Sequence, residues 1–292
     1  MLQKFETYLR QEKRYSSHTC LAYLQDLAQF SAYNQCATLL DWQEQNTATI
    51  RSWMVHLIDA GISNRSVNRK LAALRTFFKW LQKEGNIQAT PMSRVQGPKS
   101  EKRLPVFVKE QELQENRTQP LFTNNFEGIR SQLVVELFYQ TGIRLSELIQ
   151  LKDAVISSQS IKVLGKRNKE RVIPISPELY QLVERYRQMK HELKLDHPNL
   201  LLRANNEPLY PQLVYRLVKS VLTTISSVEK QSPHVLRHTF ATHMLNNGAG
   251  LETLKDLLGH ANLSATQVYT HNSFAQLKQA YQTAHPRALK TR

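Results

Sequence analysis

The chain has 292 residues, 41% of them hydrophobic, which excludes a disordered polypeptide and is long enough for two folded domains. Its 39 lysines and arginines against 24 aspartates and glutamates give a net charge of +15. Such an excess indicates a polyanionic partner, because each neutralised phosphate releases condensed counterions, although a basic surface that serves only solubility is the alternative. With neither a signal peptide nor an apolar run of ~20 residues, we expect a cytoplasmic protein without membrane insertion.

The first part of the chain is predicted to be entirely helical. Apolar spacing and start and stop signals place four helices within residues 2–13, 16–33, 47–61 and 63–85. Ser17 is the expected N-cap of the second helix and Ser63 that of the fourth, and Gly85 lies just beyond the end of the fourth.

The fourth predicted helix has two different faces. An apolar stripe indicates its core side: Val67, Leu71, Leu74, Phe78 and Leu81. Four cations are left off that stripe: Arg65, Arg69, Lys70 and Arg75. In a chain of this charge we interpret them as contacts to nucleic-acid phosphates, and the alternative is an ordinary solvated helix face.

A domain boundary is predicted where prolines and charges gather. Residues 86–105 hold three prolines, a glycine and a run of charged side chains. We therefore expect a helical domain over 1–90, whose basic helix face suggests nucleic-acid binding, a linker over 91–104 and a second domain over 105–292.

The second domain is predicted to be mixed. Helical patterns cover residues 109–116, 128–140, 145–151, 177–194 and 211–225. Two alternating segments on either side of KRNK (166–169) read as a β-hairpin, SIKVLG and ERVIPIS. From Pro233 onward, four further helical stretches are broken at 246–248, 259–262 and 270–272. The fold class is therefore mainly α with a small β-sheet.

The stretch SPHVLRHTFATHM raises a choice between a metal site and a phosphate site. His234 and His238 are spaced i, i+4, but the glutamate of an HExxH zinc site is missing and Arg237 would repel a dication. We predict no metal. With Ser232 as N-cap, His234 and Arg237 fall near the start of one helix face, where the helix dipole favours an anion. His238 and His243 are expected to be core or cap residues.

Four more candidates lie elsewhere in the second domain, and each has an ordinary alternative role. Arg144 follows a Thr-Gly break in TGIRLSEL, where it could simply pair with Glu147. Lys166 opens the hairpin turn in GKRNKER, where an exposed turn lysine is common. His260 in LLGHANLS could satisfy a helix C-terminus, and Tyr269 in SATQVYTH could be a packing residue.

Taken in order, these motifs resemble those of the tyrosine recombinase family, also called the phage integrase family, and most of all its bacterial Xer-type members. TGIRLSEL resembles the first catalytic-arginine segment, GKRNKER the lysine hairpin, HVLRHTFATHML the HxxR box and LLGHANLSATQVYTH the closing motif. Within GKRNKER, Lys169 is the alternative to Lys166. The resemblance implies six catalytic residues: Arg144, Lys166, His234, Arg237, His260 and Tyr269.

The resemblance also implies a chemistry. Tyr269 would attack a DNA phosphorus and form a 3′-phosphotyrosyl link, and strands would be rejoined through a Holliday junction without a cofactor or metal. The other groups would handle charge and protons: Arg144 and Arg237 as a clamp on the phosphate oxygens, His260 as a further donor, His234 in proton transfer, and Lys166 as the acid for the departing 5′ oxygen.

The implied architecture is a four-helix, SAM-like core-binding domain followed by an α+β catalytic domain. The implied partners are double-stranded DNA with an inverted-repeat site, three further protomers (identical or from a paralogue) and a cell-division DNA translocase at the nucleoid. A C-terminal helix over 274–289 would dock on a neighbour through Leu277, Ala280, Tyr281 and Ala284, or else pack on its own domain.

The expected role is chromosome dimer resolution at cell division. An integrase or transposase of a mobile element would use the same chemistry. A helical DNA-binding protein without catalysis is the alternative from a different class.

Overall fold

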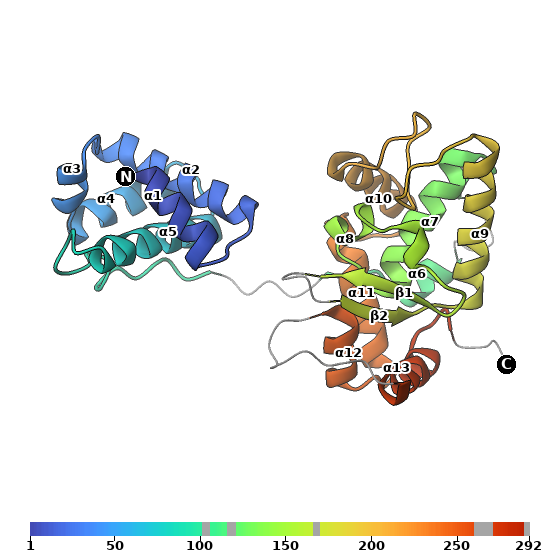
Figure 1. Ribbon diagram of the computed structural model, residues 1–292. Helices are drawn as coiled ribbons and strands as arrows, with labels where there is room; N and C mark the ends of the chain where they lie inside the picture. Colours follow the sequence, from blue (N-terminus) through green and yellow to red (C-terminus); the bar gives the residue numbers. More distant parts are fainter. Residues whose placement is uncertain (101–105, 116–120, 166–169, 260–270, 289–292) are drawn as a thin grey trace. The chain divides into compact units, whose positions relative to one another are not determined.

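The computed structural model describes residues 1–100, 106–115, 121–165, 170–259 and 271–288 (Figure 1). The chain divides into two compact units, Met1–Arg103 and Leu104–Arg292. Both are mainly helical, and the second unit contains a two-stranded sheet. Within the described ranges, no helix combines the length and apolar character that a membrane span requires.

The first unit is a small helical bundle. Its elements in chain order are α1 (Leu2–Thr7), which continues as the π-helix η1 (Tyr8–Glu12), then α2 (Ser17–Asn34), α3 (Leu39–Gln43), α4 (Thr47–Asp59) and α5 (Asn64–Lys83). The N-cap of α2 is Ser16, whose Oγ accepts from the Thr19 amide at 3.3 Å, so the prediction of Ser17 is off by one residue. The sequence did not predict α3, which is a single turn held by a Thr38–Asp41 capping box.

The core of the first unit is built around α5. All five residues of the predicted stripe are buried, and Ser63 caps this helix as predicted. Aromatic rings fill the space between α5 and the other helices: Phe77 meets Phe5 edge-on at a centroid distance of 5.0 Å and Trp42 at 4.7 Å. Trp42 is the residue that α3 contributes, which explains why so short a helix is held in place.

Residues 91–100, all of which we assigned to the linker, lie against the helices of the first unit. Met92 and Val95 are buried in its core. Arg75 donates to the Val95 carbonyl at 3.2 Å, and Asn68 donates to the Pro98 carbonyl at 2.8 Å. The first unit therefore continues past the last residue of α5 along the side of that helix.

In the described ranges the second unit follows the predicted element order, and the helical stretch predicted between 262 and 270 lies outside those ranges. Its elements are α6 (Glu110–Glu115), α7 (Phe126–Thr141), α8 (Leu145–Ile149), the 3-10 turn η2 (Asp153–Val155), β1 (Ser160–Leu164), β2 (Glu170–Pro174), α9 (Pro177–Glu192), α10 (Pro211–Ile225), α11 (Pro233–Asn246), α12 (Leu251–Leu258) and α13 (His271–Ala284). The two strands pair antiparallel, as predicted, with Val163 opposite Arg171.

Helix α7 is the centre of the second unit. It packs against α8, α9, α10 and α11, and Figure 1 shows it enclosed between the helices around it. Because partners lie on several sides, apolar residues occur all around this helix, and Leu133, Val134, Leu137 and Phe138 are all completely buried.

Helix α13 packs on its own unit. Leu277, Tyr281 and Ala284 are at most 5% exposed, and the helix contacts α11, α12 and β2. The Tyr281 hydroxyl donates to Gln140 Oε1 at 3.3 Å. In this structure the apolar stripe therefore packs on its own domain. This arrangement is the alternative that sequence analysis gave to docking on a neighbour.

Candidate active site

Helix α11 presents the HxxR pair near its start. Ser232 is the N-cap residue and Pro233 the first helical residue, as predicted, but the Ser232 hydroxyl makes no capping hydrogen bond and is buried without a partner among the described residues. His234 is exposed, whereas Arg237, one turn later on the same face, is only 8% exposed. The helix start thus presents an accessible imidazole beside a buried guanidinium.

Arg237 is held by two backbone carbonyls from other parts of the fold. It donates through Nη1 to Gly142 and through Nη2 to Leu258, the latter at 2.8 Å. Burial, followed by the nearby charges of Arg144 and Arg171, lowers the pKa of Arg237 to about 10. Arg237 therefore remains a cation at neutral pH. A bound anion would offset both the desolvation of this guanidinium and its repulsion from Arg144 and Arg171.

The Thr-Gly break before Arg144 has a steric origin. Gly142 ends α7 in the left-handed conformation, with φ of 59°. A Cβ at this position would lie 2.6 Å from Phe240 Cδ1 and 2.8 Å from Leu258 Cδ2. Only glycine lets the chain turn here while α11 and α12 approach this closely, and the turn brings Arg144 to the start of α8.

Arg144 is the N-cap residue of α8. Its backbone amide donates to Glu147 Oε2 at 2.9 Å, its Nη1 to Glu147 Oε1 at 2.7 Å, and its Nη2 to the Gly259 carbonyl at 3.0 Å. The salt bridge that was the alternative role for Arg144 is therefore present. The same carboxylate also fixes the direction of the guanidinium, whose side chain stays 24% exposed.

Arg171 and Glu147, which sequence analysis did not assign to the catalytic site, complete this cluster. Arg171, on β2, is 3% exposed and forms a double ion pair with Glu147, through Nη1–Oε1 at 3.0 Å and Nη2–Oε2 at 2.7 Å. Burial would raise the pKa of Glu147, but the hydrogen bonds and charge of Arg171, followed by the hydrogen bonds of Arg144, outweigh it and lower that pKa to about 2. Glu147 is therefore an anion at neutral pH, placed between two arginines.

The three arginines converge on the end of α12. Arg171 Nε donates to the Leu257 carbonyl at 2.8 Å, Arg237 Nη2 to the Leu258 carbonyl at 2.8 Å, and Arg144 Nη2 to the Gly259 carbonyl at 3.0 Å. These are consecutive carbonyls at a helix C-terminus, where the dipole is negative and cations are favoured. The structure thus brings Arg144 and Arg237 together, although 93 positions separate them in the sequence.

The histidines of the HxxR stretch occupy different environments. Partial burial, followed by the neighbouring His238, Arg237, Lys230 and Arg144, lowers the pKa of His234, so this imidazole is largely neutral at physiological pH. His238 is exposed, which corrects its interpretation as a core or cap residue. His243 is a core residue as expected, 3% exposed and hydrogen-bonded to Tyr139 and Val108.

Three predicted catalytic residues, Lys166, His260 and Tyr269, lie outside the described residues, as does Lys169. They remain predictions from their motifs. The described residues that precede two of them are placed. β1 ends two residues before Lys166, and Gly259, whose carbonyl binds Arg144, directly precedes His260. Among the described residues, histidine, cysteine, aspartate and glutamate form no group of three that could hold a metal ion.

The interpretation of the α5 cations as a free basic face is wrong for Lys70, which is buried, whereas Arg69 is exposed but paired. Lys70 is 6% exposed and pairs with Asp26 at 3.0 Å, and Arg69 pairs with the same carboxylate. Asp26 on α2 is itself 1% exposed, so it requires counter-charges inside the unit. Arg75 is half-buried against the Val95 carbonyl, whereas Arg65 is exposed as predicted.

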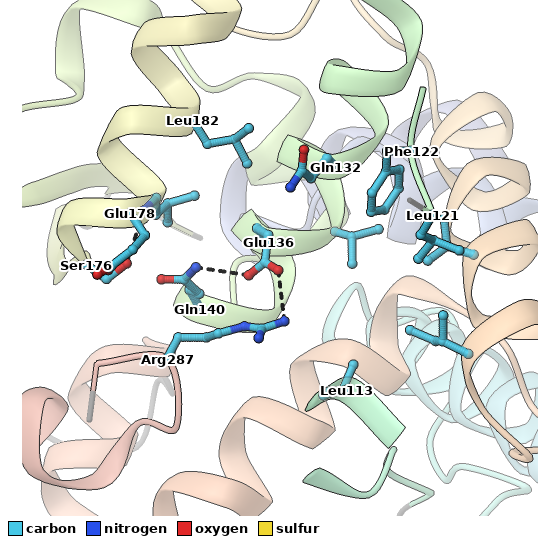
Figure 2. Close-up of a pocket in the computed structure, with 14 residues that line it drawn as sticks. Leu113, Leu121, Phe122, Gln132, Glu136, Gln140, Ser176, Glu178, Leu182 and Arg287 are labelled. Carbon is cyan, nitrogen blue, oxygen red and sulfur yellow. Dashed lines mark hydrogen bonds and ion pairs between the residues drawn. The ribbon is translucent and has the colours of Figure 1, made fainter. Parts of the chain in front are cut away.

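A separate pocket of about 370 Å³ lies between α7, α9, α10 and the C-terminal segment (Figure 2). Glu136 and Arg287 pair at 3.0 Å on its wall, and Gln140 donates to Glu136 at 2.9 Å. The rest of the lining is mostly apolar, with Leu113, Leu179 and Leu182 among its residues, and it also includes the polar side chains of Gln132, Ser176 and Glu178. Arg144, Arg171 and Arg237 do not line this pocket, so the cluster of arginines is a different site.

Two family profiles match this chain. The phage integrase family matches residues 111–276, and the phage integrase N-terminal SAM-like domain matches residues 2–85. The chain belongs to the phage integrase family. The predicted family and fold class are therefore confirmed, and the cluster of arginines lies in the integrase domain.

Relatives and solved structures agree with this membership. Tyrosine recombinase XerC of Chlorobaculum parvum is 35% identical over 98% of this integrase-family chain and 94% of its own length, and that of Staphylococcus epidermidis is 39% identical over 97% and 96%. XerH site-specific recombinase, bound to a palindromic difH substrate, has the same fold with a TM-score of 0.72 at 18% identity, covering 99% of this chain and 82% of that one. The predicted enzyme class, a tyrosine recombinase of the Xer type, is confirmed by the relatives.

Proposed function

We propose that this tyrosine recombinase cuts and rejoins DNA with Arg144 and Arg237 as a clamp on the scissile phosphate. The observation that carries the assignment is their convergence on adjacent carbonyls, those of Gly259 and Leu258. Charge builds up on the non-bridging phosphate oxygens in the transition state of phosphoryl transfer. Two guanidiniums fixed in advance beside that charge stabilise it without reorganising at the moment of reaction.

His234 is proposed to take part in proton transfer. It is exposed, one turn from Arg237, and its lowered pKa leaves it neutral and able to accept a proton. The nucleophile Tyr269, the general acid Lys166 and the further donor His260 are proposed from their motifs. Strand cleavage would then form a 3′-phosphotyrosyl bond and release a 5′ hydroxyl, and the reverse attack would rejoin the strands.

The proposed substrate is double-stranded DNA carrying an inverted-repeat recombination site. The net charge of +15 and the relation to recombinases that were solved on their DNA sites support this assignment. We further propose that four protomers, identical or from a paralogue, act together at the nucleoid. The proposed role is chromosome dimer resolution, activated by a cell-division DNA translocase, and the relation to recombinases named XerC supports an Xer-type role.

The chemistry is tested with a nicked suicide substrate, from which the strand end diffuses away after cleavage and leaves the protein attached. Wild-type protein should form the covalent adduct in the presence of EDTA, and Tyr269→Phe should form none. Attachment by the Phe variant would reject Tyr269 as the nucleophile. Strict dependence of cleavage on magnesium would reject the cation clamp as the source of catalysis.

A mobile-element role is the second candidate, because Tn1549 transposon integrase on transposon right-end DNA shares the fold, with a TM-score of 0.69 at 19% identity over 95% of this chain and 98% of that one. Sequencing the DNA that is covalently trapped in cells separates the two roles. One chromosomal site would support dimer resolution, and scattered element ends would support the mobile-element role.

A further inference from the structure

Arg171 is a buried cation, and its hydrogen bonds to the described residues all point into the protein. It is 3% exposed and uses Nε for the Leu257 carbonyl and Nη1 and Nη2 for the two oxygens of Glu147. A guanidinium enclosed in this way does not reach a DNA phosphate. Its contribution to the reaction must therefore pass through the groups that it holds.

The groups that Arg171 holds contact, or directly adjoin a contact of, each arginine of the proposed clamp. Glu147, held on one side by Arg171, binds Arg144 with its Oε1 atom at 2.7 Å. The Leu257 carbonyl, also held by Arg171, directly precedes the Leu258 carbonyl that accepts from Arg237. Arg171 itself is the second residue of β2, and Lys166 falls in the sequence between β1 and β2. One side chain thus joins α8, the end of α12 and the hairpin.

Stability alone does not call for an arginine at this position. Burying a cation carries a desolvation cost that pairing only offsets, and apolar side chains of similar volume are often equally stable in such places. Two other arginines lie nearby, so a third guanidinium adds repulsion that Glu147 must balance. What arginine provides, and an apolar side chain does not, is a rigid fork that fixes a carboxylate and a carbonyl in one orientation.

We infer that Arg171 is a positioning residue of the recombination reaction, which holds Glu147 and the end of α12 so that Arg144 and Arg237 face one phosphate. The inference rests on the proposed function of that pair. It assigns Arg171 no contact with DNA, so it predicts a defect in the cleavage step and none in DNA affinity.

The test compares Arg171→Met and Arg171→Lys with Arg130→Met in the full chain. Arg130 is a matched control, because it is also buried, 8% exposed, and also donates to a backbone carbonyl, that of Leu202 at 3.2 Å. Single-turnover attachment to the nicked substrate is measured at saturating protein. DNA dissociation constants are measured in a Tyr269→Phe background, and melting temperatures are measured for every variant.

Both Arg171 variants should attach roughly tenfold to a hundredfold more slowly, as expected when reacting groups are misplaced by about 1 Å. Their DNA dissociation constants should match that of the parent, and Arg130→Met should attach at the wild-type rate. Arg171→Lys keeps the charge but cannot serve Glu147 and Leu257 together, so a slow but folded Lys variant supports the inference even if Arg171→Met is unstable.

Three outcomes would overturn the inference. Attachment by Arg171→Lys at the wild-type rate would show that the fork is not needed. A loss of DNA affinity equal to the loss of rate would mean that Arg171 acts on binding. Melting of both Arg171 variants below the assay temperature would reduce Arg171 to a stability residue. If wild-type protein itself forms no adduct, the proposed function fails, and that result is distinct from these three.

Discussion

The hydroxyl of Tyr139 lies 3.1 Å from Nδ1 of His243, and the Nε2 atom of the same imidazole lies 3.0 Å from the Val108 carbonyl. Burial lowers the pKa of His243, so its neutral imidazole bridges these groups, with Nε2 donating to the carbonyl and Nδ1 accepting from the phenol. The Nε2 atom of His285 donates to the Tyr139 carbonyl at 3.1 Å. Two buried imidazoles thus contact one tyrosine of α7.

Acid should destabilise the second unit through His285. Burial lowers the pKa of this imidazole from 6.5 to about 3. Because the folded pKa lies below the unfolded one, the unfolded chain binds the proton more tightly. The contribution of His285 is fully present above the unfolded value and is lost as pH falls toward the folded one. Within that window the free energy of unfolding should fall by up to ~1.4 kcal/mol per pH unit.

Urea unfolding of wild type and His285→Gln at pH values from 6.5 down to 4.5 checks this contribution. Glu147 also has a lowered pKa, so its contribution to the free energy of unfolding is lost in stronger acid. The lower limit of pH 4.5 keeps most of that loss out of the measurement. His285→Gln should be less stable at neutral pH and should show a shallower pH dependence. Parallel pH profiles for the two proteins would contradict the assignment.

Arg144 should be required for strand cleavage rather than for folding. Its side chain is 24% exposed, so Arg144→Ala leaves no large cavity. Loss of one fixed donor at a developing oxyanion lowers rates by about 10²–10³. Single-turnover attachment to the nicked substrate gives the rate, with Arg203→Ala as a surface-arginine control. An Arg144→Ala protein that cleaves as fast as the control would remove this residue from the clamp.

Gly142→Ala should disturb both folding and cleavage. The added Cβ would lie 2.6 Å from Phe240 and 2.8 Å from Leu258, and the φ of 59° is itself unfavourable for alanine. We expect a loss of about 1–3 kcal/mol in the free energy of unfolding, together with slower attachment, because Leu258 carries the carbonyl that Arg237 binds.

Gly248→Ala is the matched control for that substitution. Gly248 also has a positive φ, of 88°, but a Cβ there would meet nothing within 4 Å. It should lose only the smaller amount that the backbone strain costs and should cleave normally. Equal effects of the two substitutions would show that the close approach of α11 and α12 at Gly142 is unimportant.

The cations of α5 should separate into structural and DNA-binding residues. Lys70→Ala removes a partner of buried Asp26 and should lower the free energy of unfolding by about 1–3 kcal/mol without changing the DNA affinity of the folded protein. Arg65→Ala should leave stability unchanged and reduce the slope of log affinity against log salt by about 1. Denaturant titrations and salt-dependent binding curves measure the two effects. Weaker DNA binding by a fully folded Lys70→Ala protein would contradict the division.

The residues that sequence analysis located well are those whose signal is local. The spacing of His234 and Arg237 within one helix turn, and the Thr-Gly break before Arg144, need only neighbouring residues to be recognised. The apolar stripe of α5 and the hairpin of β1 and β2 are local patterns of the same kind. Each of these predictions agrees with the structure.

The partners of buried charges were not predictable in the same way. Arg171 meets Glu147 across 24 positions and Leu257 across 86, and Lys70 meets Asp26 across 44. A helix pattern shows that a cation lies off the apolar stripe, but it does not show whether a carboxylate from another helix covers it. That is why Lys70 was interpreted as free, and why Arg171 was passed over beside the more recognisable Lys166.

The acceptors at the end of α12 are main-chain oxygens, and this has a consequence for how the protein tolerates mutation. Side-chain replacement at 257 or 258 removes no carbonyl, so any apolar residue that fills the same volume keeps all three arginines anchored. The three arginines have no such freedom, because a substitution that removes a guanidinium also removes its hydrogen bond to the carbonyl. Substitutions in this region should therefore be tolerated at the end of α12 but not at the three arginines that bind its carbonyls.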